Sequence, residues 1–279
     1  MSLLQLPEIR ADHRLASAQF DLRPDALDRW CPGVRSAASD GDASISIYEQ
    51  IGEGWDGVGV SAKRIGAALR NIGPRDITVN INSPGGDFFE GVAIYNLLRE
   101  HQGKVTVRVV GIAASAASVI AMAGDEILMG DGAFMMIHNA WAVAVGNRHD
   151  MADAASRLEP FDAAMASVYA RRSGISEAEA AAMMDKETWI DAMQAVESGF
   201  ASGLLASDDV AIGSQDNSGR KALALVDASM AKAGYTRSAR RETLKALFTG
   251  TPGAATFATP SAGHDAATML QTLTNTLKA

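Results

Sequence analysis

Residues 105–123, VTVRVVGIAASAASVIAMA, decide the fold that the sequence predicts. Over residues 105–109 valines alternate with polar residues, which is the period of two typical of a β-strand. Gly111 is expected to break this strand, and the small residues after it predict the start of a buried helix. Ser115 falls at this junction, where a hydroxyl can be exposed at the end of a sheet beside unpaired backbone N–H groups, as a hydrolase nucleophile requires. Close packing of small residues is the alternative explanation.

The composition limits the class of function. With 279 residues, 47% of them hydrophobic, the chain suits one large domain with appendages or two small domains. Acidic residues outnumber basic ones by 33 to 25, and this balance argues against a nucleic-acid partner, which needs a clustered basic face. The single cysteine, Cys31, excludes a disulfide framework and a cysteine-rich metal site, and we expect no metal or cofactor. No membrane partner is expected, because Arg108 and Gly111 interrupt the apolar run.

The first residues, MSLLQLPEIR, lack the basic and long apolar regions of a signal peptide. We therefore expect a cytoplasmic protein. The sequence also lacks a GxxxxGK[ST] loop, so nucleotide hydrolysis by that route is not expected.

Strand and helix patterns alternate from residue 43 to about residue 123. Strands are expected over 44–48 and 77–81, and between them Ser61 begins a helix that Gly73 and Pro74 end. This alternation predicts an α/β fold, with a mostly parallel sheet flanked by helices. Active sites of such folds lie at the carboxyl ends of the strands.

The turn NSPGGD, residues 82–87, follows the second of these strands. Pro84 and two glycines force a tight turn, because glycine adopts positive φ at low cost. The turn therefore presents free N–H groups at the start of a helix, where negative charge is stabilised. An ordinary strand-to-helix turn also fits, but Gly86 and Ser115 both fall at carboxyl ends of strands.

His138 is the candidate general base. Short strands are expected over 126–129 and 134–137, and of the five histidines only His138 ends an apolar strand. A structural role is the alternative for one such histidine. Beside a serine nucleophile in the same sheet, however, it can act as the base.

Residues 151–172 predict a long helix, which Pro160 should kink or begin late. Ser176 and Glu179 form a capping box for the next helix. Asp185 and Glu187 follow on a turn, where acids are normally solvated.

The two ends of the chain are less regular in sequence. Residues 1–42 are expected to be an irregular arm or a pro-segment, and 43–206 the folded domain. Residues 207–279 predict a linker, short helices over 221–233 and 238–247, and a partly disordered low-complexity tail.

Three motifs resemble those of the proteolytic subunit of the Clp protease family, in order and in approximate spacing. They are INSPGG at 81–86, GIAASA at 111–116 and MMIHN at 135–139. The resemblance covers about residues 43–205. It implies the ClpP/crotonase-like ββα spiral, homo-oligomeric rings and a protein substrate, with the 151–172 helix at ring-to-ring contacts.

The resemblance also implies the roles of individual residues. Ser115 matches the nucleophile and His138 the base, and the oxyanion donors map to the N–H groups of Gly86 and Ala116. The acid position falls on Glu187, where the family usually has aspartate. Asp185 is the alternative acid, and a Ser–His pair without a third residue is a further possibility.

Within this family, VNINSPGGD, FMMIHNAW and the tail segments TRSARR and GTPGAA look most like the phage Clp-like head maturation (prohead) proteases. This likeness implies a serine endopeptidase that cleaves capsid or scaffold protein, in the host cytoplasm or at the prohead. The first alternative is a general Clp proteolytic subunit, which receives unfolded polypeptide from a separate ATPase. The others are a crotonase-fold enzyme acting on acyl-coenzyme A, and a non-catalytic shell or scaffold component.

Overall fold

The computed structural model describes residues 19–20, 23–36, 43–54, 58–144, 146–206, 209–212 and 218–248. The chain divides into two compact units, residues 1–242 and 243–279. Of the second unit only residues 243–248 are described, and they form the end of a helix. The tail predicted to be disordered lies outside the described residues.

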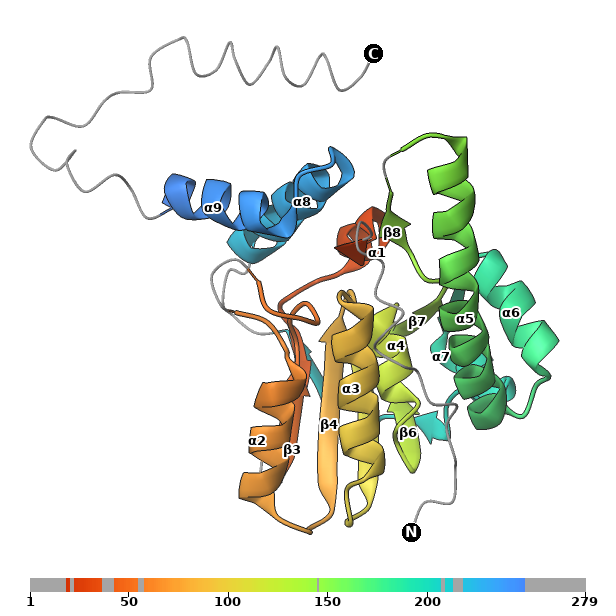
Figure 1. Ribbon diagram of the computed structural model, residues 1–279. Coiled ribbons are helices and arrows are strands. Elements are labelled where there is room, and N and C mark those ends of the chain that lie inside the picture. Colours follow the sequence, from red (N-terminus) through yellow and green to blue (C-terminus); the bar gives the residue numbers. More distant parts are fainter. Residues whose placement is uncertain are drawn as a thin grey trace, which may run out of the picture. The chain divides into compact units, whose positions relative to one another are not determined.

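A seven-stranded sheet forms the centre of the first unit (Figure 1). Its main path runs β10-β6-β5-β4-β3, and every pair along this path is parallel. A further strand, β7, pairs parallel with the last part of β5 and antiparallel with β9. The bounds are β3 (Ser44–Ile47), β4 (Ile77–Ser83), β5 (Val105–Ala114), β6 (Glu126–Met129), β7 (Phe134–Ile137), β9 (Thr188–Asp191) and β10 (Gly203–Leu204). The predicted α/β class with a mostly parallel sheet is confirmed.

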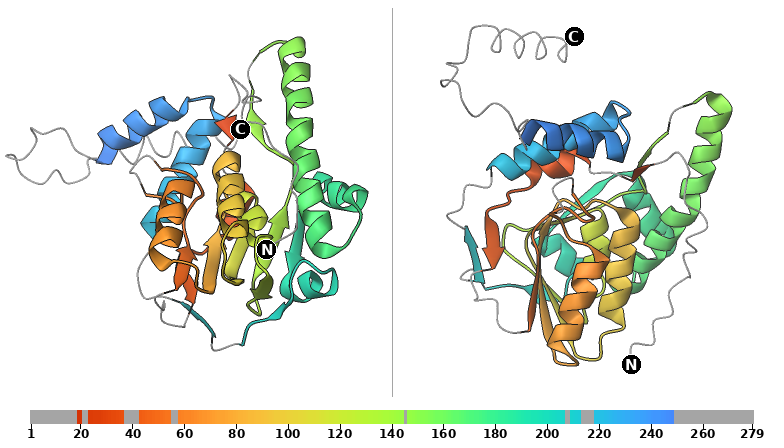
Figure 2. Two further views of the ribbon diagram at one scale, coloured as in Figure 1. Left: turned by 60° about the horizontal axis from the view of Figure 1, so that its bottom comes forward. Right: turned by 60° about the vertical axis from the view of Figure 1, so that its left-hand side comes forward.

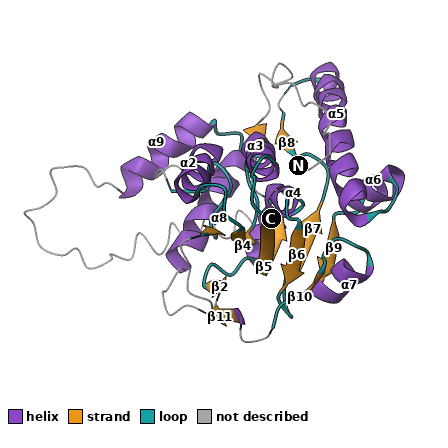
Figure 3. Cartoon of the chain, turned by 90° about the horizontal axis from the view of Figure 1, so that it is seen from below, coloured by secondary structure: helices purple, strands orange, loops and turns teal. Residues whose placement is uncertain are grey.

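Helices cover one face of this sheet, and a short strand pair lies on the other (Figure 3). The helices described between β3 and β10 are α2 (Ala62–Ile72), α3 (Phe88–Arg99), α4 (Ala116–Ala121), α5 (Arg148–Ser173), α6 (Glu177–Asp185) and α7 (Ala192–Glu197). On the other face β2 (Val34–Ser36) pairs with β11 (Val210–Ile212) over a small apolar cluster that contains Tyr48, Val110 and Leu205. The main core lies between the sheet and the helices, and it contains the fully buried side chains of Val79, Val107 and Ile127.

The helix predicted over 151–172 begins earlier than expected. A capping box at Asn147 and Asp150 starts α5 at Arg148, and Gly174 in the left-handed conformation ends it. Pro160 lies inside this helix and does not start it.

Gly111 does not break its strand, so that prediction was wrong. β5 continues through Gly111 to Ala114, and the register with β4 shifts between Ile81 and Ser83. The buried Asn82 side chain lies against Gly111, where an added Cβ would come within 2.5 Å of Asn82 Oδ1. Glycine is required here because the Asn82 side chain approaches the backbone closely. Such a close approach is one reason that glycine occurs inside strands without ending them.

The prediction that residues 1–42 are irregular was wrong for the part that is described. Gln19–Phe20 form β1, which pairs with β8 (Ala142–Val143), and Pro24–Arg29 form α1. The proline is at the first turn of α1, where its missing N–H costs nothing. The linker expected after residue 206 likewise contains β11, and the two predicted helices that follow are α8 (Ser218–Lys232) and α9 (Arg237–Phe248).

Asn82 joins the N-terminal residues to the sheet. Its Nδ2 atom donates to the carbonyls of Cys31 and Val34 at 2.8 and 2.9 Å, and its Oδ1 accepts from Ile112 N at 3.1 Å. Its own carbonyl accepts from Trp30 Nε1 at 3.0 Å. One buried amide therefore fixes both the shift in register and the position of the segment that contains β2.

Asn82→Ala is expected to lower the free energy of unfolding by about 2–4 kcal/mol, because it leaves buried backbone groups without partners. Urea denaturation measures this change. Asn80→Ala is the matched control, since Asn80 is buried on the same strand and its Oδ1 has no hydrogen-bond partner among the described residues. Equal losses in the two variants would contradict the role given to Asn82.

Candidate active site

Ser115 lies between β5 and α4, as predicted, and its backbone is strained. Its φ is 55° and its ψ is −124°, a conformation that residues other than glycine rarely adopt. The N–H group of Ser115 donates to Met136 O on β7 at 2.9 Å. A strained residue between a strand and a helix is the geometry that exposes a nucleophilic hydroxyl at the end of a sheet.

Two buried hydroxyls support this strained residue. Ser118 Oγ donates to the carbonyl of Ser115 at 2.6 Å and lies 2.8 Å from Tyr169 OH on α5. Both side chains are fully buried, and burial raises the pKa of Tyr169. Since the Ser118 proton is used on the carbonyl, Tyr169 is the donor to Ser118. The carbonyl of Ser115 is therefore fixed by a hydrogen-bond chain that reaches α5.

His138 directly follows β7 and contacts the serine. Its Nε2 atom lies 2.7 Å from Ser115 Oγ, and the residue is only 6% exposed. The pKa of His138 is lowered from 6.5 to about 4, mainly by burial and also by the positive charge of Arg23, while Asp25 acts in the opposite direction. The imidazole is therefore neutral near pH 7, and Nε2 can accept the serine proton when Nδ1 carries the hydrogen.

The NSPGGD turn packs directly against the serine. Gly85 has a φ of +92°, and an added Cβ would lie 2.5 Å from Ala114 O and 2.7 Å from Ser115 Cβ. Only glycine allows this approach, which brings the next residue, Gly86, to the same small cavity as Ser115, Ala116 and His138. The cavity measures about 20 Å³. Among the described residues, no turn, loop or cap hydrogen bond uses the N–H group of Gly86 or of Ala116. Both N–H groups are therefore available to an oxyanion.

The two candidate acids have other partners in this structure. The last paired residues of β7 and β9 are Ile137 and Thr188, so His138 and Glu187 lie just beyond the paired part, at the same end of the two strands. The Glu187 carboxylate, however, forms an ion pair with Arg23. Asp185 accepts a hydrogen bond from Asn139 Nδ2 at 2.8 Å. Within the described part of the chain no carboxylate is hydrogen-bonded to His138, so the structure brings together the serine, the base and the oxyanion donors but not the acid.

Sequence reasoning missed Arg23, Ser118 and Tyr169. Arg23 precedes a proline that begins a helix, and Leu27 and Trp30 follow at helical spacing, a pattern that could have revealed α1. Nothing in the sequence alone pairs Ser118 with Tyr169, because the contact joins two helices that are far apart along the chain.

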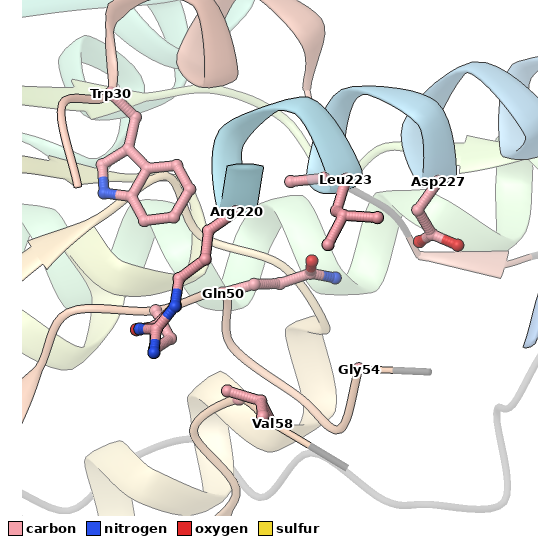
Figure 4. Close-up of a pocket in the computed structure, with 10 residues that line it drawn as sticks. Trp30, Gln50, Gly54, Val58, Arg220, Leu223 and Asp227 are labelled. Atoms are coloured by element: carbon pink, nitrogen blue, oxygen red, sulfur yellow. The ribbon is translucent and has the colours of Figure 1, made fainter. Parts of the chain in front are cut away.

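A second and larger cavity, of about 70 Å³, lies between α8 and the described residues 49–54 and 58–59 (Figure 4). Trp30, Gln50, Val58, Arg220 and Leu223 line it, and neither Ser115 nor His138 does. It is therefore separate from the candidate active site.

The described residues contain neither a metal-ligand cluster nor a membrane-spanning helix. Within them no three side chains of histidine, cysteine, aspartate or glutamate are grouped as metal ligands. Of the helices that the structure describes, none is long and apolar enough to cross a bilayer.

The fold and the Ser–His pair together define the class: an α/β protein with the site geometry of a serine hydrolase. Comparison with known proteins gives the family. The Clp protease family profile matches residues 62–208. The chain belongs to this family.

Several relatives are named as proteolytic subunits of the ATP-dependent Clp protease. The protein of Bacteroides fragilis is 30% identical over 140 residues, covering 49% of this chain and 68% of the relative. Proteolytic subunit 1 of Streptomyces avermitilis is 29% identical over 202 residues, covering 65% of this chain and 92% of the relative. The Streptococcus pneumoniae protein is 30% identical over 140 residues, covering 49% and 71%.

The lowered pKa of His138 predicts a pH-dependent loss of stability. Between pH 6.5 and about pH 4 the unfolded state binds a proton that the folded state does not, so stability falls as the pH falls. The unfolding free energy of the wild type relative to His138→Gln should decrease by about 3 kcal/mol over this range. Denaturation at several pH values measures it. His149→Gln, at an exposed position on α5, is the control, and an equal change there would contradict the assignment.

Proposed function

We propose that this protein is a serine endopeptidase in which Ser115 is the nucleophile and His138 the general base. The observation that supports it most directly is the 2.7 Å contact between Ser115 Oγ and His138 Nε2 at a strained strand-to-helix junction. A serine and a histidine in contact for structural reasons alone would not require the positive φ of Ser115. The family of the chain supports the same chemistry.

The proposed reaction is acyl transfer in two steps. His138 accepts the Ser115 proton as Oγ attacks the peptide carbonyl, and the N–H groups of Gly86 and Ala116 stabilise the oxyanion. The protonated histidine then gives its proton to the leaving amine, and the C–N bond breaks. In the second step His138 deprotonates water, which attacks the ester carbonyl and releases Ser115. Each such oxyanion donor typically stabilises the transition state by about 2.7–4 kcal/mol.

Glu187 is the proposed acid of this site. Directly opposite residues of an antiparallel pair are near neighbours, and His138 and Glu187 adjoin the last such pair, Ile137 and Thr188. In the active arrangement its carboxylate would accept the Nδ1 hydrogen of His138 and stabilise the imidazolium. Asp185 is the weaker candidate, because it already holds the Asn139 side chain, next to the base.

For the biological substrate we propose a capsid or scaffold protein, cleaved by a homo-oligomeric ring in the host cytoplasm or at the prohead. The support is the likeness of FMMIHNAW and of the tail segments to phage head maturation proteases. The names of the relatives favour a second candidate, a general Clp proteolytic subunit that acts with a separate ATPase. Cleavage of capsid protein without ATP would support the first, and copurification with a Clp-type ATPase would support the second.

Ser115→Ala should reduce peptide hydrolysis by roughly six orders of magnitude, because the serine and histidine act as a unit. Labelling with a fluorophosphonate probe and peptide mapping locates the reactive serine, with His138→Ala as the control. Retained hydrolysis in Ser115→Ala would show that the nucleophile lies elsewhere. Absence of label both from correctly assembled wild type and from variants of its N-terminal residues would instead favour a non-catalytic role.

Glu187→Gln should lower kcat more than Asp185→Asn does. The first variant removes the charge that stabilises the imidazolium, whereas the second weakens only the hydrogen bond to Asn139. Steady-state kinetics on one peptide compares the two variants. The reverse order would assign the acid role to Asp185, and equally small effects would indicate a Ser–His pair that works without an acid.

A further inference from the structure

Residues before the sheet lie next to the candidate active site. We call residues 19–20 and 23–30 the N-terminal segment. Its first part, β1, pairs antiparallel with β8, and β8 begins at Ala142, shortly after His138. An extended segment added to a short strand is a common mode of peptide recognition. The N-terminal segment therefore occupies a strand edge beside the site as a peptide ligand would.

The apolar side of α1 packs on the strands that support the catalytic residues. Ala26, Leu27 and Trp30 are buried in one cluster with Ala114 and Met136, and Trp189 packs against it. Ala114 directly precedes Ser115, and Met136 and Trp189 lie on the two strands that end beside His138 and Glu187. The position of this helix is thus coupled to all three parts of the proposed triad.

Arg23 connects the N-terminal segment to both the acid and the base. Its guanidinium forms an ion pair with Glu187, and its Nε donates to Asp25 at 3.1 Å. The same positive charge lowers the pKa of His138. Arg23 therefore holds the acid proposed for this site and also disfavours the imidazolium that must form during the reaction.

A helix from the far end of the unit holds the N-terminal segment in place. Lys221 Nζ donates to Asp28 O at 2.6 Å, and Ala228 of α8 is buried in the cluster around Trp30. The right-hand view of Figure 2 shows α1 beside α8, and Figure 4 shows Trp30 near Arg220 and Leu223. The docked position of α1, near the start of residues 1–242, thus depends on contacts with α8, near their end.

We propose that the N-terminal segment keeps the enzyme latent, and that Arg23 does so by holding Glu187 away from His138. This inference rests on the proposed function. The ion pair is partly exposed, with side chains 21% and 40% accessible, and such pairs are weak. A substrate or partner that displaces the segment from β8 can therefore free Glu187 without unfolding the domain.

The test compares variants of Arg23 in the full chain by the rate of fluorophosphonate labelling at Ser115. Arg23→Ala and Arg23→Glu should label at least tenfold faster than wild type, because Glu187 is then free to reach His138. Arg23→Lys keeps the charge and should stay slow. Arg35→Ala is the matched control, since Arg35 lies on β2 over the Tyr48 ring and also precedes the sheet. Circular dichroism checks the fold of each variant.

A second measurement follows the protonation of the His138 imidazole. Arg23→Ala should raise the pKa of His138, measured by NMR, because Asp25 then acts on it without the opposing charge. Arg35→Ala should not change it. Labelling of Arg23→Ala at the wild-type rate would overturn the latent state but leave the proposed function standing. Absence of label in every variant would overturn the proposed function and the latent state with it.

Discussion

The positive φ of Ser115 is the constraint on which the site depends. A non-glycine residue keeps this conformation only where its surroundings determine it, and here every side does so. The N–H group is bonded to β7, the carbonyl to Ser118, and the Gly85 backbone packs on the side chain. The strain is thus balanced by contacts from β7, α4 and the glycine turn, and the hydroxyl is directed at His138.

β5 brings these contacts together because it has different partners along its length. Its first half pairs with β6 and its second half with β7, while β4 lies along the other side. The shift in register at Asn82 lets the glycine turn reach the end of β5. Ser115, His138 and Gly86 therefore meet because their strands are neighbours, although they are distant in sequence.

Much of this arrangement could be predicted from the sequence. Alternating strand and helix patterns predict the parallel sheet, and the ends of β4, β5 and β7 indicate the residues that meet. Local patterns could not show that Gly111 continues a strand, because its role depends on Asn82, a partner from another strand. Nor could they show the partner of Glu187, since the ion pair joins residues separated by 164 positions. The resemblance alone indicates Glu187 as the candidate acid, and nothing in the sequence indicates its ion pair with Arg23.

The contact between α1 and α8 also has a consequence for synthesis of the protein. Chains emerge from the ribosome N-terminus first, and a domain can begin to fold as it emerges. The sheet and the Ser–His pair are complete by residue 206, before α8 has been made. The surface that receives α1 is complete only when residues 218–232 have followed. A nascent chain therefore passes through a stage in which Ser115 and His138 have come together but α1 is not yet docked, and translation of the last part of the unit ends that stage.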